Sequence, residues 1–190
     1  MASFSIIGTG SMANAIGGVL ADGGNDVSYI TREDVGTASL GDTVILAVPY
    51  GAVDAIVASY GDQLAGKTVV DITNPLNFET FDALVVPAGS SAAAEIAAKL
   101  PSSNVLKAFN TTFAATLSSK QVGGARTTVL VAGDDRDAKS ALIAAVEAGG
   151  VKALDAGSLA RAHELEAIGF QQLVLAVGEK IAWTGGFGVL

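Results

Sequence analysis

The chain has 190 residues, half of them hydrophobic, and a formal net charge of −8, which predicts one domain, or one domain with a small appendage, built on a sizeable core. It has no cysteine and a single histidine, His163, which excludes disulfides, thiolate zinc sites, cysteine nucleophiles and multi-histidine metal sites. The acidic balance without a Lys/Arg cluster argues against nucleic-acid binding. With no membrane-length apolar run and no signal-peptide pattern, a cytoplasmic protein is expected.

The N-terminal residues predict a strand, a glycine turn and a helix. An apolar, β-prone run leads into Gly8-Thr9-Gly10-Ser11-Met12-Ala13, and a proline-free stretch of helical composition follows. In that setting the G-x-G-x-x-A string is a dinucleotide-binding fingerprint. Gly8 permits the tight turn, Gly10 lets a pyrophosphate approach the backbone, and Ala13 lets the helix pack close to the strand. A plain strand–turn–helix with two turn glycines is the alternative.

Apolar strands alternate with helical stretches along most of the chain, which is typical of a doubly wound parallel sheet. The expected strands are Phe4–Ile7, Asp26–Ile30, Thr43–Ala47, Thr68–Asp71, Asn104–Ala108, Thr128–Ala132 and Lys152–Leu154. The expected helices are Ala13–Ala21, Val53–Tyr60, Ala92–Leu100, Asp137–Ala148 and one long helix over Ser158–Trp183. The predicted fold class is α/β, a Rossmann-type domain over residues 1–157 with a C-terminal helix and tail over 158–190 packed on it.

The segment after the second strand is short. Only about a dozen residues, Thr31–Asp42, separate that strand from the next, whereas a full nucleotide-binding half places a helix, a strand and another helix there. We therefore expect the usual third strand and its helix to be missing. The sheet should then have the order 2-1-4-5-6, with later strands added at the far edge.

The end of the second strand favours NADP(H). The acidic residue that binds ribose hydroxyls in NAD sites is replaced by Thr31 and Arg32, and a hydroxyl with a guanidinium suits a 2′-phosphate. One alternative places Glu33 or Asp34 on the ribose and gives NAD. Another makes Thr31 the cap of a short helical turn with Asp34 three residues on.

Polar or sterically special residues follow three later strands, where open α/β sheets bind their ligands. They are Val48-Pro49-Tyr50, Asn74-Pro75 and Asn110-Thr111-Thr112. Pro49 would fix its turn and Tyr50 could lie along the cofactor, while the amides and hydroxyls of the other loops could bind and orient the nicotinamide. Ordinary turn chemistry is the alternative for each loop.

Together these motifs resemble the NADPH:F420 oxidoreductase family, which includes the reductase domain of the STEAP metalloreductases. The resemblance rests on Ile6-Ile7-Gly8-Thr9-Gly10, Thr31-Arg32, Ala47-Val48-Pro49, Asp71-Ile72-Thr73-Asn74-Pro75-Leu76, Lys107-Ala108-Phe109-Asn110-Thr111, Ala132-Gly133-Asp134-Asp135 and Leu154-Asp155-Ala156-Gly157. It implies that Thr31-Arg32 binds the 2′-phosphate and that the loops at Pro49, Asn74 and Asn110–Thr112 flank the nicotinamide and the deazaflavin. It also implies a second-coenzyme pocket formed with the C-terminal helix and tail, and a homodimer.

The chain departs from that family in its shortened second-strand region, which puts cofactor affinity in question. It also carries Asn110 where some members carry histidine, so an acid–base role at this position is not supported.

The predicted activity is hydride transfer between NADP(H) and coenzyme F420 or a flavin, FMN or FAD. The cofactors carry that chemistry, so no catalytic residue is assigned, and the positioning candidates are Asn74, Asn110, Thr111 and Thr112. Two alternatives stay open: an NADP-binding redox sensor without turnover, and a reductase of a small carbonyl or imine that uses Tyr50 or Lys107. The predicted cofactor-binding set is Gly8, Thr9, Gly10, Ser11, Met12, Ala13, Thr31, Arg32, Val48, Pro49, Tyr50, Asn74, Pro75 and Asn110.

Overall fold

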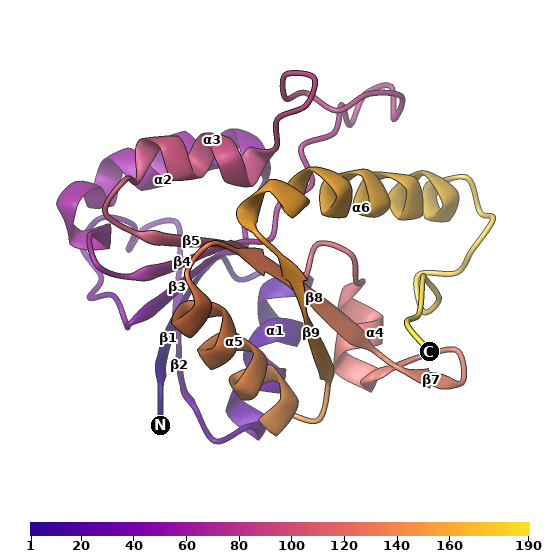
Figure 1. Cartoon of the computed structure of the whole chain (residues 1–190), viewed down its shortest axis with the longest axis horizontal. Coiled ribbons are helices and arrows are strands. Elements are labelled where there is room, and N and C mark those ends of the chain that lie inside the picture. Colours follow the sequence, from indigo (N-terminus) through magenta and orange to yellow (C-terminus); the bar gives the residue numbers. More distant parts are fainter.

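The computed structural model, which describes all 190 residues, is a seven-stranded sheet covered by helices on both faces (Figure 1). The strands follow the order β2-β1-β3-β4-β5-β8-β9. Their bounds are β1 Ser3–Ile7, β2 Asp26–Ile30, β3 Thr43–Leu46, β4 Thr68–Asp71, β5 Asn104–Lys107, β8 Thr128–Gly133 and β9 Lys152–Gly157. The predicted fold class is confirmed, and so are the missing third strand and the resulting order of the first five strands.

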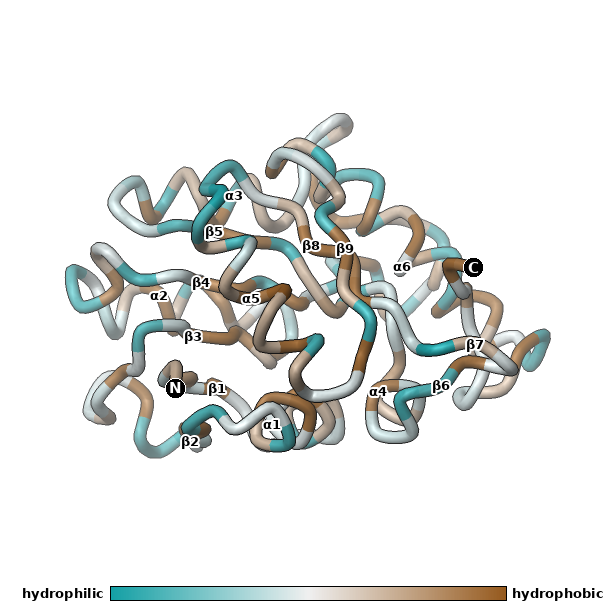
Figure 2. The backbone as a smooth tube through the Cα atoms, turned by 60° about the horizontal axis from the view of Figure 1, so that its bottom comes forward, coloured by the Kyte–Doolittle hydropathy of each residue, from teal (hydrophilic) through white to brown (hydrophobic).

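The helices divide into two layers. Helices α1 (Ser11–Asp22), α4 (Ala114–Ser119) and α5 (Arg136–Ala148) cover one face of the sheet, and α2 (Val53–Tyr60), α3 (Ala92–Lys99) and α6 (Ala162–Val177) lie on the other (Figure 1). Each layer buries its own apolar cluster against the strands. Figure 2 shows the hydrophobic segments gathered on central strands such as β3 and β4. No helix here is both long and apolar enough to span a bilayer.

The last two strands correct the expectation of a fully parallel sheet. The first five strands are parallel, but β8 pairs antiparallel with β5, and β9 runs parallel to β8. The connection from β5 consists of α4 and a small hairpin, β6 (Gln121–Val122) and β7 (Ala125–Arg126), both absent from the predicted elements. This connection does not carry the chain back to the amino end of β5, so β8 begins beyond the carboxyl end of β5 and runs in the opposite direction.

The C-terminal helix is shorter than predicted at both ends. The short 3₁₀ turns of the structure are η1 Tyr50–Ala52, η2 Gly61–Leu64 and η3 Leu159–Arg161. The last of them precedes α6, whose last residue is Val177. Gly178 caps the helix, and its backbone N–H donates to the carbonyl oxygen of Val174. Glu179 then adopts φ +56°, a left-handed conformation that ends helices. Residues 179–190 therefore form a tail that folds back, with the N–H of Phe187 donating to Gln172 Oε1 at 2.9 Å.

Candidate cofactor site

The glycine turn after β1 has a conformation that only glycine fits. Gly8 has φ +123°, and a Cβ there would overlap the carbonyl oxygen of Ala47. Its N–H donates to the carbonyl oxygen of Ile30 at 3.0 Å. The turn thus lies where the ends of β1, β2 and β3 meet, which is where the fingerprint predicts it.

Gly10 leaves open space above the start of α1. It is the N-cap residue of that helix, no side chain caps the helix end, and a Cβ on Gly10 would meet no atom within 4 Å. The first N–H groups of a helix lack intrahelical acceptors, so those that follow Gly10 can bind an anion. Asn14, which sequence reasoning missed, holds the turn by donating from Nδ2 to the carbonyl oxygens of Thr9 at 3.0 Å and Gly10 at 3.1 Å.

A cavity of about 450 Å³ extends from this turn toward the end of β2. Six predicted residues line it: Gly8, Thr9, Gly10, Arg32, Val48 and Pro49. The remaining lining residues, not predicted, are Ile7, Ile30, Val35, Ala47, Ala52, Ala55, Ile56 and Ser59. Arg32 makes no ion pair with any carboxylate of the chain. Its guanidinium is therefore available to an anionic ligand.

The shortened segment after β2 still borders this cavity, through Arg32 and Val35. Val35 and Leu40 pack against the apolar cluster of α2 and α3, and Lys67 Nζ donates to the carbonyl oxygens of Leu40 at 3.2 Å and Gly41 at 2.9 Å. These hydrogen bonds hold the short turn in place at the position where larger domains have an extra strand. Within it, the Thr31 hydroxyl donates to the Asp34 carboxylate, as in the turn alternative, and Thr31 does not line the cavity. Its role at the 2′-phosphate stays a prediction.

A second cavity, of about 520 Å³, lies beyond the ends of β4 and β5. Its lining residues are Ser11, Met12, Ile72, Asn74, Asn110, Thr112, Phe113, Ala114, Ala115, Leu173 and Trp183. None of them carries a charge. Gly10 lines the first cavity and Ser11 the second, so both cavities reach the N-terminus of α1. An elongated ligand whose anionic centre lies at this helix end would place one end in each cavity.

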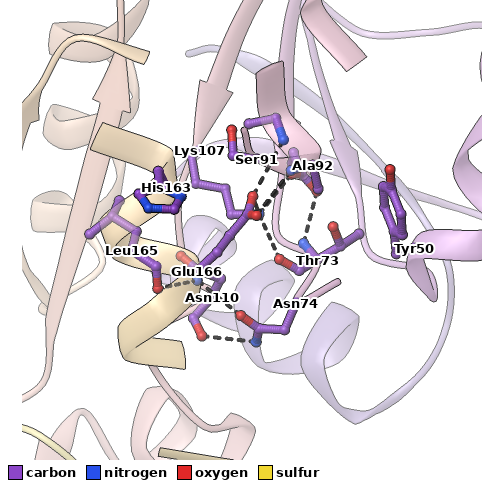
Figure 3. Close-up of polar contacts among 12 residues, drawn as sticks. Tyr50, Thr73, Asn74, Ser91, Ala92, Lys107, Asn110, His163, Leu165 and Glu166 are labelled. Carbon is purple, nitrogen blue, oxygen red and sulfur yellow. Dashed lines mark hydrogen bonds and ion pairs between the residues drawn. The ribbon is translucent and has the colours of Figure 1, made fainter. Parts of the chain in front are cut away.

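Two asparagines from neighbouring strand ends form a pair at the second cavity (Figure 3). Asn110 Nδ2 donates to Asn74 Oδ1 at 3.0 Å and to the carbonyl oxygen of Leu165 at 2.8 Å, while Asn74 Nδ2 donates to the carbonyl oxygen of Asn110 at 3.1 Å. Asn110 Oδ1 is buried and has no partner. The preceding residue, Phe109, is fully buried with φ +64°, a conformation that costs free energy and recurs at functional sites.

Behind the pair lies a buried charge cluster that joins four elements (Figure 3). Lys107 Nζ lies 2.7 Å from Asp71 Oδ2, 2.8 Å from Glu166 Oε1 and 2.6 Å from the carbonyl oxygen of Thr73. Glu166 also accepts from the N–H of Ala92 at 2.9 Å, at the start of α3. Burial raises the pKa of Glu166, and the neighbouring Lys107 ammonium opposes that rise. Sequence reasoning missed Glu166, although an acid within the apolar pattern of the last helix was a signal.

The other predicted residues are placed as follows. The Tyr50 hydroxyl donates to Glu95 at 3.0 Å, and burial, together with that carboxylate, raises the pKa of Tyr50 to about 12. Tyr50, Pro75 and Thr111 line neither cavity. Ala13 is buried against the core behind the glycine turn.

The chain matches the family described as NADP oxidoreductase, coenzyme F420-dependent, over residues 27–75. It is 32% identical over 154 residues to the F420-dependent NADP reductase of Methanocaldococcus jannaschii, which covers 79% of this chain and 69% of that protein. The chain belongs to this family. It is therefore placed among the NADP-dependent oxidoreductases, as its motifs predict.

Three further proteins are similar to this chain. The rat metalloreductase STEAP3 is 32% identical over 178 residues, which cover 86% of this chain and 35% of that protein, so the chain spans about a third of that relative. A crystal structure from Arthrobacter sp. FB24, of a candidate F420-dependent NADP reductase, superposes with a TM-score of 0.84 and 22% identity over all of both chains. An imine reductase from Bacillus cereus superposes with a TM-score of 0.67 and 16% identity, covering 94% of this chain and 63% of its own. These two likenesses show the shared fold.

Proposed function

We propose that this chain transfers a hydride between NADP(H) and coenzyme F420 or a flavin. The observation that carries the proposal is the pair of cavities that both reach the N-terminus of α1: one is bordered by an unpaired arginine, and the other is uncharged and partly aromatic. A dinucleotide would span both, with its pyrophosphate at this helix end. The uncharged cavity would then hold the nicotinamide together with a flat acceptor ring.

The residues of the first cavity fit the adenosine half of NADP. The open space at Gly10 and the N–H groups of α1 suit the pyrophosphate. The Arg32 guanidinium, free of ion pairs, suits a 2′-phosphate through a forked contact. The small side chains Ala52 and Ala55 leave room for a flat base on the α2 side of the cavity.

The residues of the second cavity fit the nicotinamide half. Asn110 carries a buried oxygen without a donor, and a carboxamide N–H is the kind of group that would satisfy it. NADPH supplies the hydride when bound. The protein orients the ring through the Asn74–Asn110 pair and excludes water with Phe113, Leu173 and Trp183. The aromatic rings of Phe113 and Trp183, whose centroids are 4.9 Å apart, suit a flat acceptor.

The proton chemistry of the site argues against a small carbonyl or imine substrate. Such a substrate normally needs a positioned acid, and the two candidates for that role are engaged elsewhere. Lys107 is fully buried between two carboxylates, and the Tyr50 hydroxyl donates a hydrogen bond to Glu95 and lines neither cavity. A ring acceptor needs less from the protein, because the cofactors carry the chemistry.

A turnover assay tests the proposal. NADPH oxidation should occur with F420, FMN or FAD offered separately, and Tyr50→Phe should retain it, because Tyr50 lines neither cavity. NADPH binding without turnover of any of the three would instead support the sensor alternative. Turnover of a small cyclic imine that Tyr50→Phe abolishes would contradict the proposal.

Gly10→Ala should separate cofactor binding from folding. The added methyl group meets no protein atom, so the free energy of unfolding should change by less than about 1 kcal/mol. The same methyl group would occupy the space through which a pyrophosphate approaches, so the Kd for NADPH should rise about tenfold or more. Isothermal titration calorimetry and chemical denaturation measure the two effects. Gly124→Ala, another open position, is the matched control, and unchanged NADPH affinity in Gly10→Ala would refute the placement.

We also propose that residues 158–190 complete the site of the domain at 1–157, because Leu173 and Trp183 from this segment line the second cavity. Formation of a homodimer and a cytoplasmic location stay predictions.

A further inference from the structure

Gly169 lies where the backbone of α6 presses against the asparagine pair. It is buried, and a Cβ at this position would overlap Asn74 Oδ1 and come within 2.8 Å of the Asn110 carbonyl oxygen and 2.9 Å of Asn110 Nδ2. One turn earlier, the carbonyl oxygen of Leu165 accepts from Asn110 Nδ2 (Figure 3). The helix backbone over 165–169 thus forms a wall behind both amides, and only a residue without a side chain allows so close an approach.

The helix cannot easily move away from the pair. Glu166, between Leu165 and Gly169, is fully buried and bonded to Lys107 Nζ on β5 and to the N–H of Ala92 on α3. Moving α6 outward would break these contacts and leave buried charges unpaired, which is strongly unfavourable. A side chain at position 169 would therefore displace the Asn74 amide and the Asn110 backbone carbonyl, and not the helix.

We propose that Gly169 is a positioning residue for the nicotinamide, acting through Asn74 and Asn110. This proposal rests on the proposed function, in which the pair orients the nicotinamide. Gly169 allows the helix backbone to hold both amides in one arrangement, with Asn110 Nδ2 shared between Leu165 and Asn74. An alanine at 169 displaces the Asn74 amide, breaks its bonds to Asn110 and disorders the nicotinamide end. The first cavity, proposed to hold the adenosine, is unaffected, because neither asparagine lines it.

The test compares Gly169→Ala with Gly18→Ala, a helical glycine of α1 that is exposed and has open space around its Cβ position. Alanine favours helix over glycine, so neither variant loses helix propensity. In Gly169→Ala, the affinity for 2′,5′-ADP, which has no nicotinamide, stays within about twofold of wild type. The kcat of NADPH oxidation falls about 10- to 100-fold, as expected for a misplaced reacting group. Gly18→Ala matches wild type in both measurements.

A double variant separates positioning from a general loss of structure. If Gly169→Ala acts through the pair, adding it to Asn74→Ala lowers kcat by much less than it does in the wild-type background. Full additivity would overturn the proposal, as would an unchanged kcat in Gly169→Ala or a parallel loss of 2′,5′-ADP binding.

If wild type turns over none of the three acceptors, the proposed function fails but this inference is still decided. The emission of bound NADPH reports the surroundings of its nicotinamide. A changed emission in Gly169→Ala, with 2′,5′-ADP binding retained, supports the positioning role. An unchanged emission overturns it.

Discussion

Replacing Lys107 with methionine is expected to lower the free energy of unfolding by about 3–5 kcal/mol. The ammonium group is the only cation within the buried cluster, where it contacts both Asp71 and Glu166. Methionine has a similar length but no charge, so both carboxylates would remain buried without a counter-ion. For a domain of this size the melting temperature should fall by about 6–20 °C. Guanidinium denaturation and calorimetry of the purified protein measure both quantities.

The loss of stability in Lys107→Met should depend on pH. Burial raises the pKa of Glu166 in the folded protein, and Lys107 opposes that rise, so the pKa of Glu166 should rise further in the variant. A carboxyl group with a raised folded pKa binds more protons folded than unfolded. Stability is therefore lost as pH rises from the unfolded pKa through the folded one. The gap between variant and wild type should shrink toward pH 5, and a gap independent of pH would contradict the uncompensated-charge explanation.

Glu166→Gln provides the matched control for this cluster. It removes one of the two negative charges and leaves Lys107 paired with Asp71 at 2.7 Å. The Gln carbonyl oxygen can still accept one of the hydrogen bonds that Glu166 makes. We therefore expect Glu166→Gln to be less destabilising than Lys107→Met. The reverse order would mean that the bond from Ala92 N–H to Glu166, and not the balance of charge, dominates the cluster.

Replacing Arg32 with alanine is expected to weaken NADPH binding about 10- to 150-fold while the affinity for NADH stays the same. A hydrogen bond to a charged group contributes about 1.5–3 kcal/mol, and each 1.4 kcal/mol is about tenfold in Kd. Arg32 lines the first cavity and has no carboxylate partner in the chain. Removing the Arg32 side chain should therefore change the free energy of unfolding little and weaken binding of the 2′-phosphate strongly. Calorimetric titration with each nucleotide measures the two affinities.

Arg136→Ala is the control for the change of net charge. Arg136 is exposed at the start of α5, outside both cavities, and makes no ion pair. Its removal should leave the preference for NADPH over NADH intact. If Arg32→Ala weakened the binding of NADPH and NADH equally, Arg32 would contact a part that both nucleotides share and not the 2′-phosphate. Unchanged NADPH affinity would remove Arg32 from the phosphate site and return attention to Glu33 and Asp34.

Local sequence patterns were sufficient to predict those features of the structure that depend on residues close together along the chain. The strand before Gly8 and the helix after it are local, and the backbone conformation of Gly8 confirms the tight turn that the motif predicts. The brevity of Thr31–Asp42 was sufficient to predict the missing strand, because a segment that short cannot form another crossover. The alternation of apolar strands and helices gave the α/β class for the same reason.

Contacts between distant segments decided the rest. A Val-rich strand such as β8 has the same apolar pattern in either direction, so only its connection through α4 and the hairpin set it antiparallel to β5. The burial of Lys107 and its ion pair with Glu166 depend on how α6 packs over the strand ends.

By itself, the sequence determined the family, the fold class and the residues of the glycine turn. Each of these follows from short motifs or from apolar patterns among residues that are neighbours along the chain. Only the tertiary structure placed Gly169 against Asn74 and Asn110 and brought Trp183 from the tail into the second cavity. Those placements depend on the distance between α6 and the sheet. That distance results from the packing of many side chains and from the buried charges that hold the helix in place, and no local pattern encodes it.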